Sequence, residues 1–213
     1  MLQKGNKKII IAWSFYDWAN SVYPLVITST IFPIFYENIT KEEVGGVVEM
    51  FGRKFGSSEI YSYAISLSFL IISFVSPALS GIADYAGKKK RFMQFFCYLG
   101  ALSCASLYFF DTANIALGLL SVVFASIGFN GSLVFYNAFL PEIAEPKDQD
   151  KVSAKGFAMG YIGSSILLIL NLVMLKVFDV NVRWCFVTVA VWWIAFAQIP
   201  FFIIVFFQYY ADR

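Results

Sequence analysis

The sequence contains no histidine and few charged residues for its length of 213 residues. Histidine is the commonest metal ligand in proteins and the only side chain that ordinarily titrates near neutral pH, so its absence removes the usual ligand and the usual general base. Only 14% of the residues are charged, whereas about 25% is typical of a soluble domain. The three cysteines, Cys97, Cys104 and Cys185, lie in apolar runs without zinc or redox spacing, so we expect buried structural thiols. We therefore predict neither a metal site nor a cofactor.

Long apolar runs dominate what is present, since 59% of the residues are hydrophobic. A helix needs about 20 mostly apolar residues to cross a bilayer. Six segments meet this requirement: residues 9–36, 60–83, 92–110, 113–139, 156–178 and 184–209. The runs lack the alternating pattern of membrane β-strands. The sequence therefore predicts an all-α polytopic membrane protein, with residues 1–213 forming one six-helix domain in the lipid bilayer.

Positive charges are unevenly divided between the two sets of loops. Eleven Lys and Arg residues fall at the N-terminus, between spans two and three, between spans four and five, and at the C-terminus, whereas five fall on the other side. Because cytoplasmic loops are enriched in Lys and Arg, we predict that both termini are cytoplasmic. Residues 37–59 are then the one sizeable loop expected on the opposite side.

An acidic residue, Asp17, interrupts the first apolar run. Asp17, Asn20, Ser21, Pro24 and Thr28 have the spacing of one helix face. An ionisable residue inside a span costs about 2.5–3.5 kcal/mol on insertion scales, so it usually faces a cavity or a partner. Two interpretations follow for Asp17, which either contacts a substrate or proton or is bonded to a neighbouring helix. Pro24 is consistent with a structural bend or with a gating element.

The fourth and fifth spans carry further polar and small residues. Asn130 and Asn137 are seven residues apart and so share a helix face, with the Tyr136 hydroxyl nearby. Buried amides need partners, so these side chains contact either a ligand or other helices. In the fifth span, a face of small residues is expected to admit close helix packing: Ser153, Gly156, Gly160, Gly163 and Ser164.

The connection between spans two and three reads SGIADYAGKK over residues 80–89, and we expect the chain to turn at Gly81 and Gly87. Cations between two membrane spans indicate a cytoplasmic anchor rather than a nucleic-acid site. This loop resembles the signature loop of the major facilitator superfamily, Gly-x-Leu-Ala-Asp-Arg-x-Gly-Arg-Arg, and departs from it at positions 80 and 85. The resemblance implies that a cytoplasmic gate is formed by Asp84, Gly87, Lys88 and Lys89.

Three further stretches are similar to the autophagy-related vacuolar amino-acid effluxers and their prokaryotic relatives. They are YDWANS at 16–21, YNAFLP at 136–141 and GFAMGYIG at 156–163. This resemblance implies one half of a facilitator fold, built from two inverted three-helix repeats whose first helices, spans one and four, line a central cavity. It also implies a plasma membrane location in a prokaryote or a vacuolar one in a eukaryote.

The resemblance implies a secondary transporter that moves a small polar solute, such as an amino acid, by alternating access. A second six-helix half would come from the same gene, a partner chain or a second copy. Substrate or a coupling proton would be bound by Asp17, Asn20, Ser21, Asn130, Tyr136 and Asn137. The alternative is a non-transporting scaffold or regulatory protein whose polar residues only join helices. An intramembrane enzyme is disfavoured because the sequence lacks H-E-x-x-H and paired intramembrane aspartates.

Overall fold

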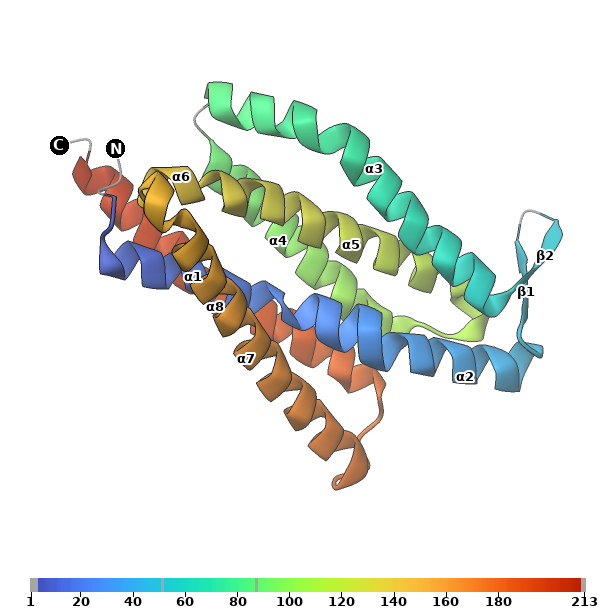
Figure 1. The fold of residues 1–213 in the computed structure, drawn as a ribbon. Coiled ribbons are helices and arrows are strands. Elements are labelled where there is room, and N and C mark those ends of the chain that lie inside the picture. Colours follow the sequence, from blue (N-terminus) through green and yellow to red (C-terminus); the bar gives the residue numbers. More distant parts are fainter. Residues whose placement is uncertain (1–3, 51, 87, 212–213) are drawn as a thin grey trace.

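The computed structural model describes residues 4–50, 52–86 and 88–211, without the side chains of residues 82–86 and 204–211. Helices make up most of it (Figure 1). The long helices are α1 (Lys7–Asn20), a π-helix (Tyr23–Ile31), α2 (Phe32–Val44), α3 (Ser57–Ala86), α4 (Lys89–Ser106), α5 (Ile115–Ala138), α7 (Gln149–Lys176) and α8 (Arg183–Ala211). The short elements are β1 (Val47–Met50), β2 (Arg53–Gly56) and α6 (Leu140–Ile143).

Six helical segments correspond to the six predicted spans. Five are long and apolar enough to cross a membrane by themselves: Ser57–Gly81, Lys89–Phe109, Thr112–Ile143, Pro146–Lys176 and Arg183–Ile203. The first span instead consists of α1, the π-helix and α2, which follow one another as a bent rod (Figure 1). The prediction of an all-α polytopic membrane protein is confirmed.

The bend in the first span begins where Pro24 enters the π-helix. Proline has no backbone N–H and its ring clashes with the preceding turn, so it disturbs regular α-helical bonding. Two side chains bond to carbonyls within this segment. The Thr28 hydroxyl donates to the Pro24 carbonyl at 2.9 Å, and the Thr30 hydroxyl donates to the Leu25 carbonyl at 2.6 Å. Hydroxyl bonding of this kind makes an irregular helix tolerable in a membrane.

Helix packing follows one pattern in both halves of the chain. α1 packs on α7 and α8, α5 packs on α3 and α4, and α4 packs on α8. The contacts of the first span with spans five and six therefore match those of the fourth span with spans two and three. Two three-helix repeats require this correspondence. The tightest of these contacts joins α4 to α5, where a β-carbon on Gly128 would overlap the Gly100 backbone.

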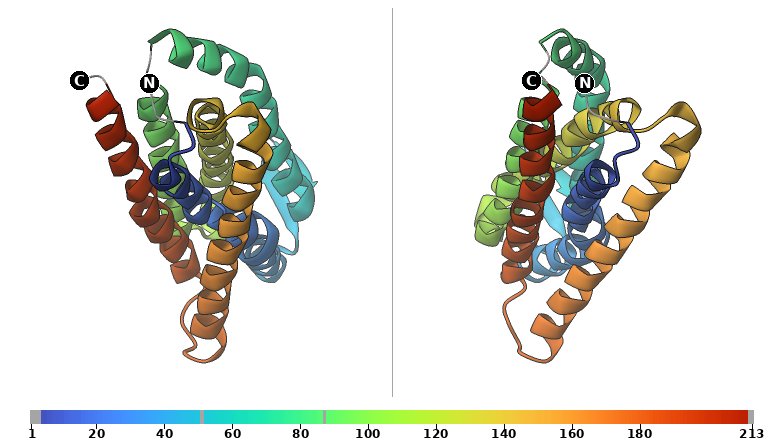
Figure 2. Two further views of the ribbon diagram at one scale, coloured as in Figure 1. Left: turned by 60° about the vertical axis from the view of Figure 1, so that its left-hand side comes forward. Right: turned by 90° about the vertical axis from the view of Figure 1, so that its left-hand side faces the viewer.

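The two ends of the bundle differ in composition. Both chain termini lie at one end, together with α6 and the α3–α4 connection, while the β-hairpin and the α7–α8 connection lie at the other (Figures 1 and 2). The segments that carry most of the positive charge therefore gather at the end that holds the termini. This arrangement agrees with the predicted topology, and the assignment of that end to the cytoplasm stays a prediction.

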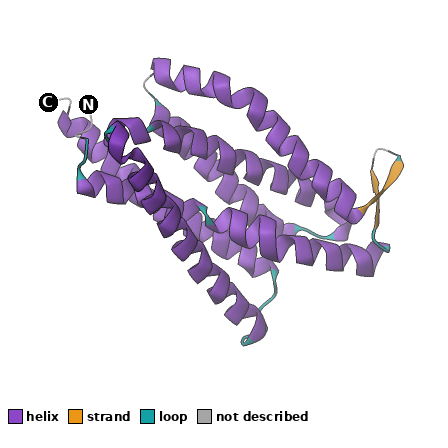
Figure 3. Ribbon diagram, viewed as in Figure 1, coloured by secondary structure: helices purple, strands orange, loops and turns teal. Residues whose placement is uncertain are grey.

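The prediction of a loop over residues 37–59 is wrong for most of that segment. α2 continues to Val44 and ends at Gly45, whose φ of 65° is readily adopted only by glycine. β1 and β2 then pair antiparallel from Val47 opposite Gly56 to Met50 opposite Arg53 (Figure 3). Since β1 and β2 are only four residues each, the hairpin is a small addition to an otherwise helical fold.

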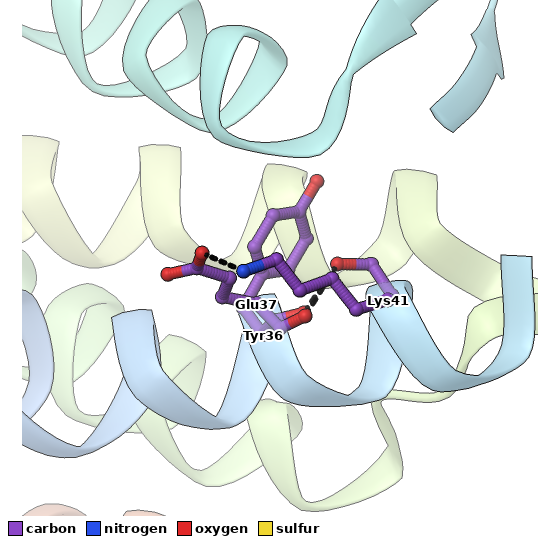
Figure 4. A network of polar contacts seen from close by, with 4 residues as sticks. Tyr36, Glu37 and Lys41 are labelled. Atoms are coloured by element: carbon purple, nitrogen blue, oxygen red, sulfur yellow. Dashed lines mark hydrogen bonds and ion pairs between the residues drawn. The ribbon is translucent and has the colours of Figure 1, made fainter. Parts of the chain in front are cut away.

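Two local side-chain contacts lie on α2 beyond the apolar run. Lys41 Nζ lies 2.6 Å from Glu37 Oε1, one helical turn away, and the Thr40 hydroxyl donates to the Tyr36 carbonyl at 2.7 Å (Figure 4). Such pairs of opposite charge four residues apart support an exposed helix by about 0.2–0.5 kcal/mol. The polar stretch after Tyr36 stays helical to Val44, and the ion pair adds a small part of the stabilisation.

Candidate functional site

Asp17 of α1 and Tyr136 of α5 meet in the interior of the bundle. The Tyr136 hydroxyl donates to Asp17 Oδ2 at 2.8 Å, and Asp17 is only 5% exposed. A buried carboxylate is costly unless it is hydrogen-bonded, so the phenol compensates part of the cost. The contact joins the first helices of the two three-helix repeats, which are the helices that the facilitator resemblance assigns to a central cavity.

Trp13 holds Tyr136 in position. Its ring stacks on the Tyr136 ring at 4.1 Å with an interplanar angle of 9°, and its indole N–H donates to the Tyr136 carbonyl at 3.0 Å. Trp13 precedes Asp17 by four residues and so lies on the same helix face. Sequence reasoning missed Trp13, although this spacing to the buried acid could have indicated it.

The glycines of α7 allow this helix to approach the Asp17–Tyr136 pair. A β-carbon on Gly156 would lie 2.6 Å from Asp17 Oδ2 and 2.7 Å from the Tyr136 hydroxyl oxygen. Further along α7, a β-carbon on Gly160 would overlap the Ser21 hydroxyl, and one on Gly163 would lie 2.8 Å from the Trp18 ring. The prediction of a close-packing face is confirmed, and Gly156 also borders the candidate site.

A cavity of about 320 Å³ opens beside Asp17. Its lining comes from the first span, α5 and α7: Asp17, Ser21, Pro24, Leu25, Ser29, Phe129, Leu133, Phe157, Tyr161 and Ser164. Asp17 is the only charged residue among them. An apolar wall with a few polar groups and one charge is typical of a small-molecule site, and the volume is at the lower end of the range for such sites.

A second cavity of about 440 Å³ lies between the π-helix, α3 and α5. Its lining carries hydroxyls and an amide but no charged group: Tyr23, Pro24, Thr28, Tyr61, Ser62, Ile65, Ser66, Phe69, Ser126, Phe129 and Asn130. Pro24 and Phe129 line both cavities, so the two are neighbours across these side chains. Within the described residues, the buried hydroxyls of Tyr23 and Tyr61 have no hydrogen-bond partner.

The structure separates the predicted site residues into three groups. Asp17 and Ser21 line the first cavity, and Tyr136 is bonded to Asp17 without being part of that lining. Asn130 lines the second cavity, where its amide donates to the Ser126 carbonyl at 2.9 Å. Asn20 and Asn137 line neither cavity.

The physical reason is helix rotation. Each residue advances the helix by about 100°, so Asn137 points away from the direction of Tyr136 and is exposed. Asn20 is fully buried, and its amide nitrogen and oxygen have no partner among the described groups. Asn20 therefore faces protein and neither cavity in this structure, and its part in binding stays a prediction.

The predicted gate is described only in part. Gly87 and the side chain of Asp84 lie outside the described residues. α3 continues to Ala86, so the predicted turn at Gly81 is wrong. Lys88 is exposed, whereas Lys89 Nζ binds Glu142 Oε1 at 2.8 Å and thereby links the start of α4 to α6. Glu142 was missed because nothing in its local sequence indicates a partner more than fifty residues away.

Among the described side chains, no three from His, Cys, Asp and Glu come close enough to hold an ion. The three cysteines are buried free thiols, as predicted from their apolar surroundings.

Comparison with known proteins adds a family relationship. The model of a family described as "Vacuole effluxer Atg22 like" matches residues 5–206. The chain is 39% identical over 161 residues to the uncharacterized MFS-type transporter YxiO of Bacillus subtilis, an alignment that covers 76% of this chain and 36% of the relative. It is 25% identical over 171 residues to autophagy-related protein 22 of Coccidioides immitis, covering 64% of this chain and 28% of that protein. The matched region thus corresponds to about a third of the length of these relatives.

Proposed function

Because the chain belongs to the Atg22-like vacuole effluxer family, a family of membrane transporters, we propose that it forms the N-terminal half of a secondary transporter for a small polar solute. The solute is an amine-bearing molecule such as an amino acid. It crosses by alternating access as this half moves against a second six-helix half, supplied by the same gene product, a partner chain or a second copy. The relationship to transporters favours this function over that of a non-transporting scaffold.

The observation that supports the proposal best is a cavity-lining carboxylate with a neutral partner. Asp17 is bonded to the Tyr136 phenol, and the linings of both cavities contain no Lys or Arg. A buried acid that serves only to join helices is usually paired or fully hydrogen-bonded. A carboxylate accepts about four hydrogen bonds, and Tyr136 occupies one of these positions. The ammonium group of a solute, or a coupling proton, would supply the missing positive charge.

The two cavities also define which part of a solute this half would recognise. The acid in the first cavity suits an amine, and the hydroxyls and the Asn130 amide in the second suit an uncharged polar group. The carboxylate of an amino acid would find no cation in either lining, so we expect it to face the second half. Asn20 and Asn137 contribute to binding only if the helices rotate during transport.

The orientation and the gate complete the proposal. The end that holds both termini is the cytoplasmic end, and the Lys89–Glu142 ion pair acts there with Asp84, Gly87 and Lys88 as the inward gate. The membrane is the plasma membrane in a prokaryote and the vacuolar membrane in a eukaryote. A cysteine placed at the exposed Lys4, compared with one at the exposed Arg53 of the hairpin, tests the orientation by its reaction with an impermeant maleimide on intact cells.

The test of function uses the full-length transporter in proteoliposomes with a set of radiolabelled amino acids and amines. Asp17→Asn removes the charge but keeps the size and one hydrogen bond to Tyr136. We expect loss of flux with membrane abundance near that of the parent protein. Tyr136→Phe, which retains the ring stacked on Trp13, should weaken transport less. Equal losses of abundance and flux in Asp17→Asn would instead support a purely structural acid.

A further inference from the structure

A third cavity, of about 410 Å³, lies at the end of the bundle that holds both termini, outside the site described above. It is bordered by Leu79 of α3, Lys88 and the first turns of α4. Its lining consists of four apolar and two cationic side chains: Leu79, Phe92, Phe95, Phe96, Lys88 and Arg91. The cavity wall is almost entirely apolar, because Lys88 and Arg91 line it with their aliphatic stems, and these two exposed side chains add positive charge beside it.

The two cations of this cavity remain available for an outside partner. Lys88 and Arg91 are both exposed, and in the described part of the chain neither forms a salt bridge. Lys89, which lies between them, is directed to Glu142 on α6. Two uncompensated positive charges beside each other attract a negatively charged group at the membrane surface.

The apolar wall continues along the outer surface of the membrane-crossing helices. Phe95 is 60% exposed and Leu102, further along α4, is 61% exposed, while Phe74 on α3 is 77% exposed. In a span, an apolar side chain that no protein covers faces the acyl chains of the bilayer. The distance along α4 from Arg91 to Leu102 is about 16 Å, close to the roughly 15 Å thickness of one leaflet of hydrocarbon. A bound molecule with a charged head and an apolar tail of one leaflet in length would match both features.

We propose that this cavity binds an anionic phospholipid, with its phosphate between Lys88 and Arg91 and an acyl chain along Phe95 and Leu102. Free phosphate shares the head-group chemistry, but it would make no use of the apolar wall. A zwitterionic lipid would cancel part of the attraction to the two cations through its own ammonium group. The proposal does not depend on solute binding, because none of these residues lines either cavity at the candidate site, and only Lys88 is shared with the proposed gate.

The experiment measures lipid binding to the full-length protein by native mass spectrometry, with dioleoyl phosphatidylglycerol and dioleoyl phosphatidylcholine added in equal amounts. The parent protein should retain phosphatidylglycerol preferentially. Each of Lys88→Gln and Arg91→Gln should reduce that retention about fivefold, and the double variant roughly 30-fold. The matched control is Lys147→Gln with Lys151→Gln, which removes two exposed cations from the same end of the bundle but from a different connection, and should leave retention unchanged.

Two further measurements distinguish a bound phospholipid from bound free phosphate. Phe95→Gln should weaken retention of phosphatidylglycerol, whereas Phe95→Leu should preserve it, because only an acyl chain uses the apolar wall. Millimolar inorganic phosphate should not displace the lipid. The proposal is overturned if the parent protein retains both lipids equally, if the control pair loses as much retention as Lys88→Gln with Arg91→Gln, or if inorganic phosphate displaces the lipid. Matching circular dichroism of all variants excludes misfolding as the cause of a loss.

Discussion

Replacing Gly156 with alanine tests whether the approach of α7 determines the geometry at Asp17. The added β-carbon would lie 2.6 Å from Asp17 Oδ2, 2.7 Å from the Tyr136 hydroxyl oxygen and 3.1 Å from Trp13 Cζ3, whereas ordinary contact begins at 3.4 Å. The first two distances are short by about 0.8 and 0.7 Å, so either α7 moves outward or the two side chains separate.

Both responses should lower the free energy of unfolding by a measurable amount. Overpacking of this kind typically costs about 1–3 kcal/mol, and loss of the 2.8 Å hydrogen bond between Tyr136 and Asp17 alone accounts for about 1.5–3 kcal/mol if the acid is charged. We expect Gly156→Ala to lower the midpoint of thermal unfolding of the full-length protein in detergent and to reduce solute flux at equal abundance in proteoliposomes.

The matched control is Gly81→Ala on α3. This glycine is also helical, but a β-carbon there would meet none of the described atoms within 4 Å, so the substitution should be neutral or slightly stabilising through the higher helix propensity of alanine. An unchanged unfolding midpoint and unchanged flux in Gly156→Ala would refute the contact geometry on which the candidate site rests. An equal decrease in both variants would show a general intolerance of helical substitutions.

Substitutions at three other positions test separate contacts. Trp13→Phe loses the 3.0 Å indole hydrogen bond but keeps an aromatic ring against Tyr136. Because the ring is kept, the unfolding midpoint should fall less than in Trp13→Ala. Equal decreases would contradict a stacking role. Glu142→Gln removes the partly exposed ion pair with Lys89, which should change stability by no more than about 1 kcal/mol while altering the rate of solute exchange, and an unchanged rate would argue against a gate. Gly128→Ala should prevent close packing of α4 against α5 and so lower the amount of folded protein in the membrane. This amount is measured by fluorescence-detected size exclusion chromatography. Normal amounts would contradict the backbone contact with Gly100.

Several features of the candidate site were predictable because they depend on one helix at a time. A carboxylate within an apolar run is costly wherever the run is placed, so Asp17 is recognisable as a site residue without a structure. Spacing alone places Ser21 one turn from Asp17 and groups the glycines of the fifth span on one face. The structure agrees with both, since Ser21 lines the cavity beside Asp17 and the glycines meet the first span.

Other features depend on how helices rotate and which side chains they meet. Asn20 satisfies the same spacing rule as Ser21, yet it is fully buried because the helices around α1 cover that side of it. Tyr136 reaches Asp17 across more than a hundred residues of chain, whereas its neighbour Asn137 faces away. Such outcomes are decided by packing between elements, which leaves no local pattern in the sequence.

The number of spans, their approximate ends and the side on which positive charge gathers were determined by the sequence alone. A bilayer requires every backbone polar group to be bonded within its own segment, so an apolar run of sufficient length becomes a helix in any context. The tertiary structure alone decided that Trp13, Asp17, Tyr136 and Gly156 come into contact, that Lys89 binds Glu142, and that Lys88 and Arg91 are exposed. These contacts exist because glycines let particular helix faces approach, and only the assembled bundle sets that rotation.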